Sequence, residues 1–198
     1  MLNTSSKHVI KLTVVGLIIF LSLLLIMNIK KPLPVVQVEA NEITFDTPEK
    51  LDAAADLIMI ASPSKDFMDR EHKVTFFDDG TIEDYYTLTE VQVEKIIKAT
   101  NNFNLPKNNT FSIIEPVGIV ERSIGKRKLV TNNYVELKQK SSYIMFLQQN
   151  SMGQYGIINI NLGKFNLDNK DPLDIGEKNH QRLRSLKMIF SKNILSTR

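Results

Sequence analysis

Short apolar runs separated by turn residues dominate the chain after residue 44. The runs 57–61 and 143–147 are almost continuously apolar, which predicts strands that are buried on both faces. Alternation of period two from Tyr85 to Val93 predicts a long strand with one buried face. A strand of that length usually bends, and a bent strand shared between two sheets is one way in which a small barrel closes.

Turn signals separate further predicted strands. Asp78-Asp79-Gly80-Thr81 predicts a hairpin turn between a strand at 73–77 and the long strand that starts at Ile82. Residues 64–72 are rich in charge and are predicted to form a loop, and residues 134–137 a short strand or a turn. The other predicted strands lie at 111–115, within a hairpin at 118–130, at 155–160 and at 163–167.

Two helices flank these strands. Thr47-Pro48-Glu49 supplies an N-cap residue, a proline at the first helical position and an acid in the first turn, so a short helix is expected over 48–55. Apolar residues at helical spacing predict an amphipathic helix over 179–195 with a basic polar face. The fold class is therefore mainly β, namely a small antiparallel barrel or sandwich of five to seven strands with a short N-terminal and a longer C-terminal helix.

Residues 12–29 carry no charged side chain, and at ~1.5 Å per helical residue they would extend for ~27 Å, close to the thickness of a bilayer core. A buried core helix seldom lacks a polar face over this length. A signal peptide cleaved after Ala40 is a second alternative, but Lys30 and Lys31 lie between the apolar segment and that site. We expect a transmembrane signal anchor. The predicted organisation is a tail at 1–11, the anchor at 12–29, an extended linker at 30–43 and a β-rich domain at 44–198.

The orientation of the anchor rests on the charges at its two ends. Lys7 and Lys11 precede the apolar segment, and Lys30 and Lys31 follow it, so the positive-inside count is nearly equal on the two sides. We expect a cytoplasmic N-terminus and an extracytoplasmic domain, with the protein a single-pass component of the cell membrane.

Composition narrows the chemistry. The chain contains no Cys, which excludes disulfides, thiolate metal sites, cysteine nucleophiles and a lipoprotein anchor. This composition, rich in Asn, Ile and Lys, is typical of exported proteins of many Gram-positive bacteria. The formal charge of +3 arises from the four lysines around the apolar segment, and the remainder is nearly neutral. Overall charge therefore gives no support for a nucleic-acid partner.

Motif searches assign no catalytic, cofactor-binding or metal-binding residue. His72 and His180 are the only histidines after the anchor, and neither has a second ligand at metal-site spacing. Gly118 and Gly125-Lys126-Arg127 lack the spacing and the hydroxyl residue of a phosphate loop. Ser123 lacks the flanking glycines of a nucleophile elbow.

Three weaker signals have structural explanations that we prefer. The acidic stretch of Asp168, Asp171, Asp174 and Glu177 could bind Ca²⁺, but Lys170 stands where an oxygen ligand is needed, and an acidic turn is the simpler interpretation. The basic face of the helix at 179–195 could contact anionic lipid or wall polymers, although a solvated face is commoner. The Tyr85-Tyr86 pair could stack on a sugar or base, yet alternation turns one of the two rings inward.

A family resemblance rests on the order of the segments 55–60, 86–98, 137–147, 155–158 and 163–165. Over roughly residues 50–167 this pattern resembles uncharacterised, membrane-anchored or secreted bacterial proteins whose domain is of the netrin/TIMP type. The resemblance implies a five-stranded OB barrel with helices packed at its ends. It implies no site residues, because the inhibitory branch of that family uses an N-terminal Cys, and this chain has none.

The sequence therefore predicts a membrane-tethered, extracytoplasmic binding or accessory module without an enzymatic site or cofactor. Its expected partners are the membrane and an envelope protein or cell-wall polymer. Two alternatives stay open, a hydrolase built from dispersed residues and a regulator that faces the cytoplasm.

Overall fold

A computed structural model describes residues 14–17, 20, 32–101, 103–123 and 125–171. The chain divides into two compact units, Met1–Leu33 and Pro34–Arg198. In the first unit residues 14–17 are helical. Within the described residues, no helix has the length and apolar character needed to cross a membrane. Most of the predicted anchor at 12–29, and all of the predicted helix at 179–195, lie outside the described residues.

The second unit consists mainly of strands, with one short α-helix and two 3₁₀ turns in its described part. In chain order its elements are β1 (Val35–Val38), α2 (Pro48–Ala54), β2 (Leu57–Pro63), η1 (Phe67–Asp69), β3 (Glu71–Phe76), β4 (Ile82–Lys98), β5 (Thr110–Glu115), β6 (Val117–Arg122), β7 (Gly125–Thr131), β8 (Tyr143–Gln149), β9 (Tyr155–Ile157), η2 (Ile160–Gly163) and β10 (Lys164–Asn166).

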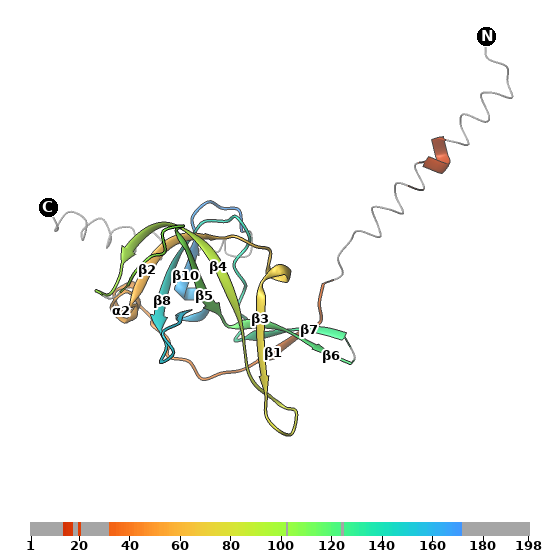
Figure 1. Cartoon of the computed structure of the whole chain (residues 1–198), viewed down its shortest axis with the longest axis horizontal. Coiled ribbons are helices and arrows are strands. Elements are labelled where there is room, and N and C mark those ends of the chain that lie inside the picture. Colours follow the sequence, from red (N-terminus) through yellow and green to blue (C-terminus); the bar gives the residue numbers. More distant parts are fainter. Residues whose placement is uncertain (1–13, 18–19, 21–31, 102, 124, 172–198) are drawn as a thin grey trace, which may run out of the picture. The chain divides into compact units, whose positions relative to one another are not determined.

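Five of these strands close into a barrel (Figure 1). Strand β4 lies between β2 and β5, and the ring continues through β9 and β8 back to β2. All pairings in this ring are antiparallel except that of β5 with β9, which is parallel. The predicted barrel is confirmed, but the prediction of a purely antiparallel one is wrong. In the sequence, β6, β7 and β8 lie between β5 and β9. The chain returns from them so that β5 and β9 run in the same direction.

The long strand β4 pairs with three other strands along its length. It runs for 17 residues and pairs with β3 at its start, with β5 in its middle and with β2 at its end. Two register shifts in the pairing with β2 mark the bend that lets the sheet close. The predicted bent strand is therefore confirmed. Figure 1 shows the hairpin of β3 and β4 extending away from the barrel.

Burial on both faces explains the continuous apolar runs of β2 and β8. Leu57, Met59 and Ala61 point into the barrel, where they pack with alternate residues of β8. Ile58 points outward into a second core with Ile144 and other residues. Each strand therefore has no polar face to offer, which is why its sequence does not alternate.

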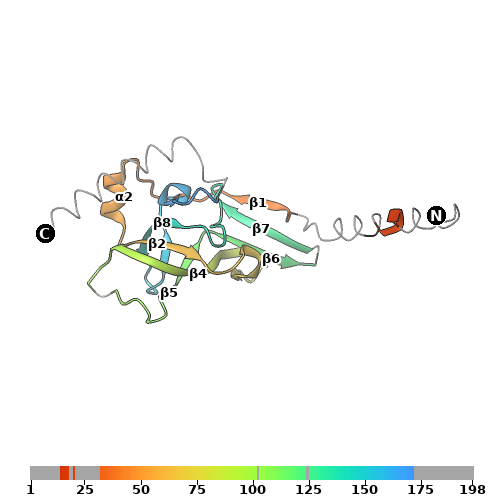
Figure 2. The same ribbon diagram turned by 90° about the horizontal axis from the view of Figure 1, so that it is seen from above.

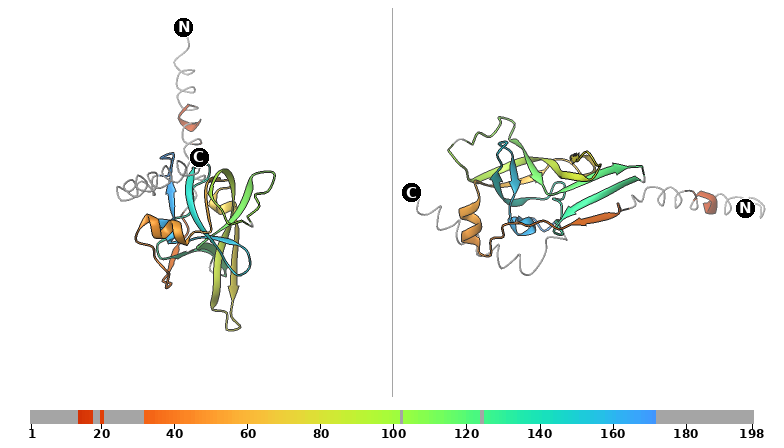
Figure 3. Two further views of the ribbon diagram at one scale, coloured as in Figure 1. Left: turned by 90° about the vertical axis from the view of Figure 1, so that its left-hand side faces the viewer. Right: turned by 90° about the horizontal axis from the view of Figure 1, so that it is seen from below.

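Helix α2 covers part of this second core. Thr47 caps the helix by accepting a hydrogen bond from the Lys50 amide at 3.3 Å, and Pro48 is the first helical residue. Leu51 is the buried residue of the helix and packs against Ile58 and Phe146. The predicted short helix is thus confirmed. Figures 2 and 3 show α2 at the opposite end of the domain from β1, β6 and β7.

A separate three-stranded sheet holds β6, β7 and β1, with β1 at its outer edge (Figure 2). Strands β6 and β7 form the expected hairpin, but β1 pairs with β7 in parallel. Strand β1 lies inside the segment 30–43, which the sequence indicated as a linker because two prolines precede it. The described residues hold ten strands, more than the five to seven predicted, because the three-stranded sheet and the two strands β3 and β10 add to the barrel.

Candidate functional site

A buried ion pair joins Glu115, at the end of β5, to Arg70, which follows η1. The side chains of Arg70 and Glu115 are 1% and 0% exposed, and the guanidinium Nη1 lies 2.6 Å from carboxylate Oε1. Thr89 donates to the same oxygen, while the Tyr134 hydroxyl and the Leu137 amide donate to Oε2, each at 2.8 Å. Two donors therefore satisfy each carboxylate oxygen.

The guanidinium of Arg70 is equally well satisfied. Its Nε and Nη2 atoms each donate to the carbonyl of Lys65 at 3.1 Å, and Nη2 also donates to the carbonyl of Leu137 at 2.6 Å. Burial raises the pKa of Tyr134 well above its usual value, and the carboxylate of Glu115 adds to this effect. With every donor and acceptor engaged inside the protein, this network holds four segments together and offers no group to a substrate.

Sequence reasoning missed both members of the pair. Arg70 lies in the segment 64–72 that the charge pattern predicted to be a loop, and residues 67–69 form η1 instead. Glu115 occupies the position on β5 that, by alternation, shares the inward face with Ile113. An acid at an inward position of an apolar strand was the signal that a buried partner existed.

His72 lies on β3 and is half-buried. Its Nδ1 is 2.8 Å from the Thr87 hydroxyl, and its ring meets Phe67 edge to face. Burial lowers the pKa of His72, and the nearby charges of Arg70 and Lys126 contribute to the decrease. This environment is that of a structural histidine. His180 lies outside the described residues.

Within the acidic stretch, Asp168 caps neighbouring backbone. Asp168 accepts hydrogen bonds from the amides of Ser142 and Lys170 and from the side chain of Asn166. Burial opposes the ionisation of Asp168, but these donors outweigh it and lower its pKa. Asp171 accepts a hydrogen bond from Tyr143 at 2.7 Å.

Among the described residues no group of three or more potential ligands could hold a metal ion. Asp174 and Glu177 lie outside the described residues.

The glycines and the serine singled out by motif searches are placed around the hairpin of β6 and β7. Gly125 has a positive φ of 105°, as the turn requires, and Ser123 is exposed beside it. Gly118 packs on the ring of Tyr85. These residues form a turn and a packing contact, with no phosphate-binding loop.

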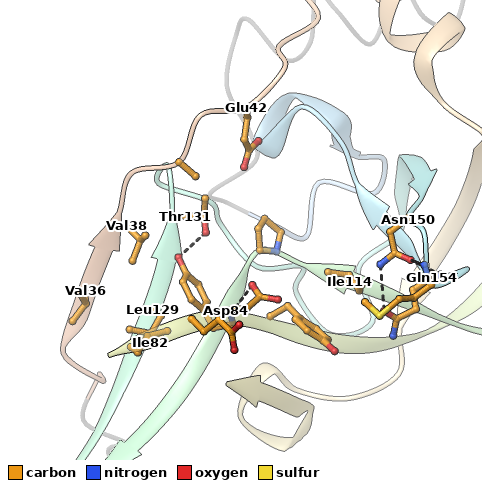
Figure 4. A pocket seen from close by; sticks show the side chains of 16 residues that line it. Val36, Val38, Glu42, Ile82, Asp84, Ile114, Leu129, Thr131, Asn150 and Gln154 are labelled. Atoms are coloured by element: carbon orange, nitrogen blue, oxygen red, sulfur yellow. Dashed lines mark hydrogen bonds between the residues drawn. The ribbon is translucent and has the colours of Figure 1, made fainter. Parts of the chain in front are cut away.

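A groove of about 600 Å³ runs between the three-stranded sheet and the barrel. We call it the groove. Figure 4 shows side chains from β1, β7, the start of β4 and the turn between β8 and β9 around it. Its apolar lining includes Val36, Val38, Ile82, Ile114, Leu129 and Met152.

The lining of the groove carries negative charge. Glu42, Glu83 and Asp84 line it, and the described lining residues include no Lys or Arg. The hydroxyl of Tyr85 is 2.6 Å from that of Thr131. Partial burial raises the pKa of Tyr85, and the charges of Asp84 and Glu42 raise it further. Both carboxylates therefore contribute to the electrostatic environment of Tyr85.

Loss of solvation also raises the pKa of Glu42 above its ordinary value of 4.5. A positive charge placed near Glu42 would favour its ionised form.

Tyr85 and Tyr86 are both half-buried, and both are among the residues that line the groove. The pairing of β3 with β4 stays in regular register across these two residues, so their side chains alternate along β4. That alternation turns one of the two rings inward stays a prediction.

A second hollow of about 720 Å³ adjoins the groove and shares Val38 and Ala40 with it. Its lining is mainly of side-chain amides, among them Gln37, Asn132 and Asn133. Asn132 binds both the amide and the carbonyl of Ala40, at 3.1 and 2.8 Å, which fixes the chain after β1. An apolar, acidic hollow is thus continuous with a polar one along one side of β1.

Comparison with known proteins leaves this geometry as the main guide to function. No protein-family model matches the chain, and no curated protein matches it significantly.

Proposed function

We propose that this protein is a membrane-tethered, extracytoplasmic binding module, and that the groove is its ligand site. The observation that carries the proposal is the combination of apolar walls, two tyrosines and three acidic residues without a lining Lys or Arg among the described residues. Such a surface favours an apolar ligand that carries an ammonium or guanidinium group.

The pairing order of the barrel supports an OB-type fold and, through it, the netrin/TIMP-like resemblance. In OB barrels the face of the second and third strands and the loop between the last two strands bind ligands. Here the corresponding elements are β4, β5 and the turn of Asn150 to Gln154, and all three contribute residues to the groove. The acidic lining disfavours nucleic acids and anionic wall polymers, because both would meet like charge. A segment of an envelope protein is the partner that we favour.

The apolar segment at 12–29 is the basis for the proposed tether. Its length and its flanking lysines support a signal anchor in the cell membrane. A reporter that is active in only one compartment, fused after Arg198, tests the orientation. Activity outside the cell membrane supports the module, and activity only in the cytoplasm would favour a cytoplasmic regulator.

The hydrolase alternative gains no support from the groove. Its described lining residues include no Ser, Cys or His, and the hydroxyl of Thr131 already bonds to Tyr85. We therefore propose a role in binding without catalysis.

Charge reversal in a small peptide tests the proposal. The probe is a capped, fluorescent hexapeptide of alternating lysine and valine, and its counterpart carries glutamate in place of lysine. We expect the full-length protein in phosphatidylcholine nanodiscs to bind the lysine peptide and not the glutamate peptide, with affinity that falls as salt rises.

Variants of the groove acids locate the binding. The double substitution Glu42→Gln with Asp84→Asn should weaken binding roughly three- to tenfold, as loss of two partly exposed charges implies. Glu90→Gln is the matched control, because Glu90 is an exposed acid on the same strand β4 outside the groove lining. Equal binding of both peptides, or no effect of the double substitution, would refute the proposed site.

A further inference from the structure

The outer edge of β1 carries backbone groups that have no partner strand among the described residues. On the inner side, the carbonyls of Pro34 and Val38 accept hydrogen bonds from Lys128 and Asn132 of the β7 side, at 2.9 and 3.0 Å. Successive residues of a strand point their backbone groups to opposite sides. The N–H and C=O groups of Val35 and Gln37 therefore point away from β7, towards the free edge.

Apart from its length of four residues and the prolines before it, this edge lacks the protection that natural sheets give their edges. Exposed edge strands usually carry lysines, inward charges or a bulge that prevents pairing with another chain. Strand β1 reads Val-Val-Gln-Val, its parallel register with β7 is regular, and Val35 is 53% exposed. The prolines Pro32 and Pro34 limit the edge only at its start. An apolar, regular and open edge is a place where a partner strand can pair.

The free edge and the groove belong to the same strand. Figure 4 shows Val36 and Val38 pointing from β1 into the groove. A chain that pairs with the outer edge would place every second side chain on the same face as these two valines. Those side chains would extend the apolar wall of the groove, and a lysine or arginine among them could approach Glu42, which follows β1 in the chain. The amide-lined hollow beyond Val38 would receive the polar continuation of such a chain.

We propose that the ligand is an extended polypeptide segment that adds as a fourth strand to the outer edge of β1. This inference rests on the proposed function of the groove and goes beyond it, since a small amine or a sugar would use the groove without the edge. The bound segment alternates apolar with other residues and carries positive charge, which complements the three groove acids. Main-chain hydrogen bonds to β1 supply affinity, and the groove selects the side chains.

Backbone methylation of the probe peptide tests strand addition. In the full-length protein in phosphatidylcholine nanodiscs, the lysine–valine hexapeptide is compared with two forms that carry N-methyl groups at alternate amides of opposite parity. Only one parity of amides faces β1, so one form should lose binding and the other should keep it. Equal affinity of the two methylated forms would overturn the inference.

A matched pair of variants tests the same edge from the protein side. Gln37→Pro and Gln37→Ala both remove the side chain that accepts a bond from the Asn133 amide, but only proline removes the outward N–H. We expect Gln37→Pro to bind the peptide about three- to tenfold more weakly than Gln37→Ala, with equal melting temperatures. Equal affinity of the two variants would contradict strand addition.

The two proposals fail in different ways. If the lysine peptide binds and the Glu42/Asp84 variant weakens it, while methylation parity and Gln37→Pro have no effect, the groove function stands and strand addition is wrong. If the lysine peptide does not bind at all, both proposals are wrong.

Discussion

Substitution of Glu115 by glutamine is the sharpest test of the structural account of the buried network. The amide has nearly the shape of the carboxylate but carries no charge and only one acceptor oxygen. The carboxylate accepts from four groups, Arg70, Thr89, Tyr134 and Leu137. In Glu115→Gln the guanidinium therefore loses its buried counter-charge, and one pair of donors faces an NH₂ group.

The expected cost follows from the burial of both partners. Removing one member of a buried ion pair costs about 3–5 kcal/mol, because the remaining charge is left in a poorly solvating interior. The orphaned donors contribute to this same loss and are not counted again. Domains have free energies of unfolding of about 5–15 kcal/mol, so a large share of the stability would be lost.

A double-mutant cycle separates the ion pair from other effects. Arg70→Met alone should destabilise by a similar amount, because it leaves the carboxylate unpaired. The destabilisation of the double variant should be smaller than the sum for the two single variants by about 1–3 kcal/mol, because the double variant retains no lone buried charge.

Urea unfolding followed by far-UV circular dichroism measures these changes, because the chain contains no Trp to report by fluorescence. Glu90→Gln is the control, and as a surface change it should alter the free energy of unfolding by less than about 0.5 kcal/mol. A loss below about 1 kcal/mol in Glu115→Gln, or purely additive effects in the cycle, would refute the reasoning.

Three further predictions follow from single residues. Gly163→Ala should destabilise by more than the ~1–3 kcal/mol usual for overpacking, since its Cβ would lie 1.7 Å from the Ile158 carbonyl oxygen; a melting temperature close to wild type would contradict this. His72 has a lowered pKa in the folded state, so the stability that its neutral form contributes is present above the ordinary value of 6.5 and is lost as the pH falls below it. His72→Gln should show a weaker decline in melting temperature between about pH 7 and pH 5 than wild type, and an unchanged decline would argue against this. Peptide binding should weaken as the pH falls through the raised pKa of Glu42, and Glu42→Gln should lack that step in a pH titration; the same titration curve in both proteins would exclude Glu42 from the site.

Local pattern alone determined much of the secondary structure. The apolar runs at 57–61 and 143–147 predicted β2 and β8, and the Thr47 cap predicted α2, because these features depend on neighbouring residues only. The alternation along β4 identified its buried face, and its length indicated a barrel. Periodicity reports which side chains are buried, and burial is what these elements have in common.

Partnerships between distant segments were decided by tertiary structure. Strand β1 looked like part of a linker because its four residues form a strand only beside β7. The parallel pairing of β5 with β9 depends on how the chain returns after three other strands. A strand's sequence records its burial but not the neighbour that provides its hydrogen bonds.

The charged residues show most clearly the difference between what local sequence determines and what tertiary structure decides. The sequence by itself determined that the chain after its apolar segment has no Cys, only two His and no phosphate-loop motif, and it predicted a small β-rich domain. Only the tertiary structure could show that Arg70 meets Glu115 from 45 positions away, or that Glu42 and Asp84 line the same groove as Tyr85. A charged residue has the same sequence signature in a solvated loop and in a buried pair, because the difference lies in a partner that folding brings to it.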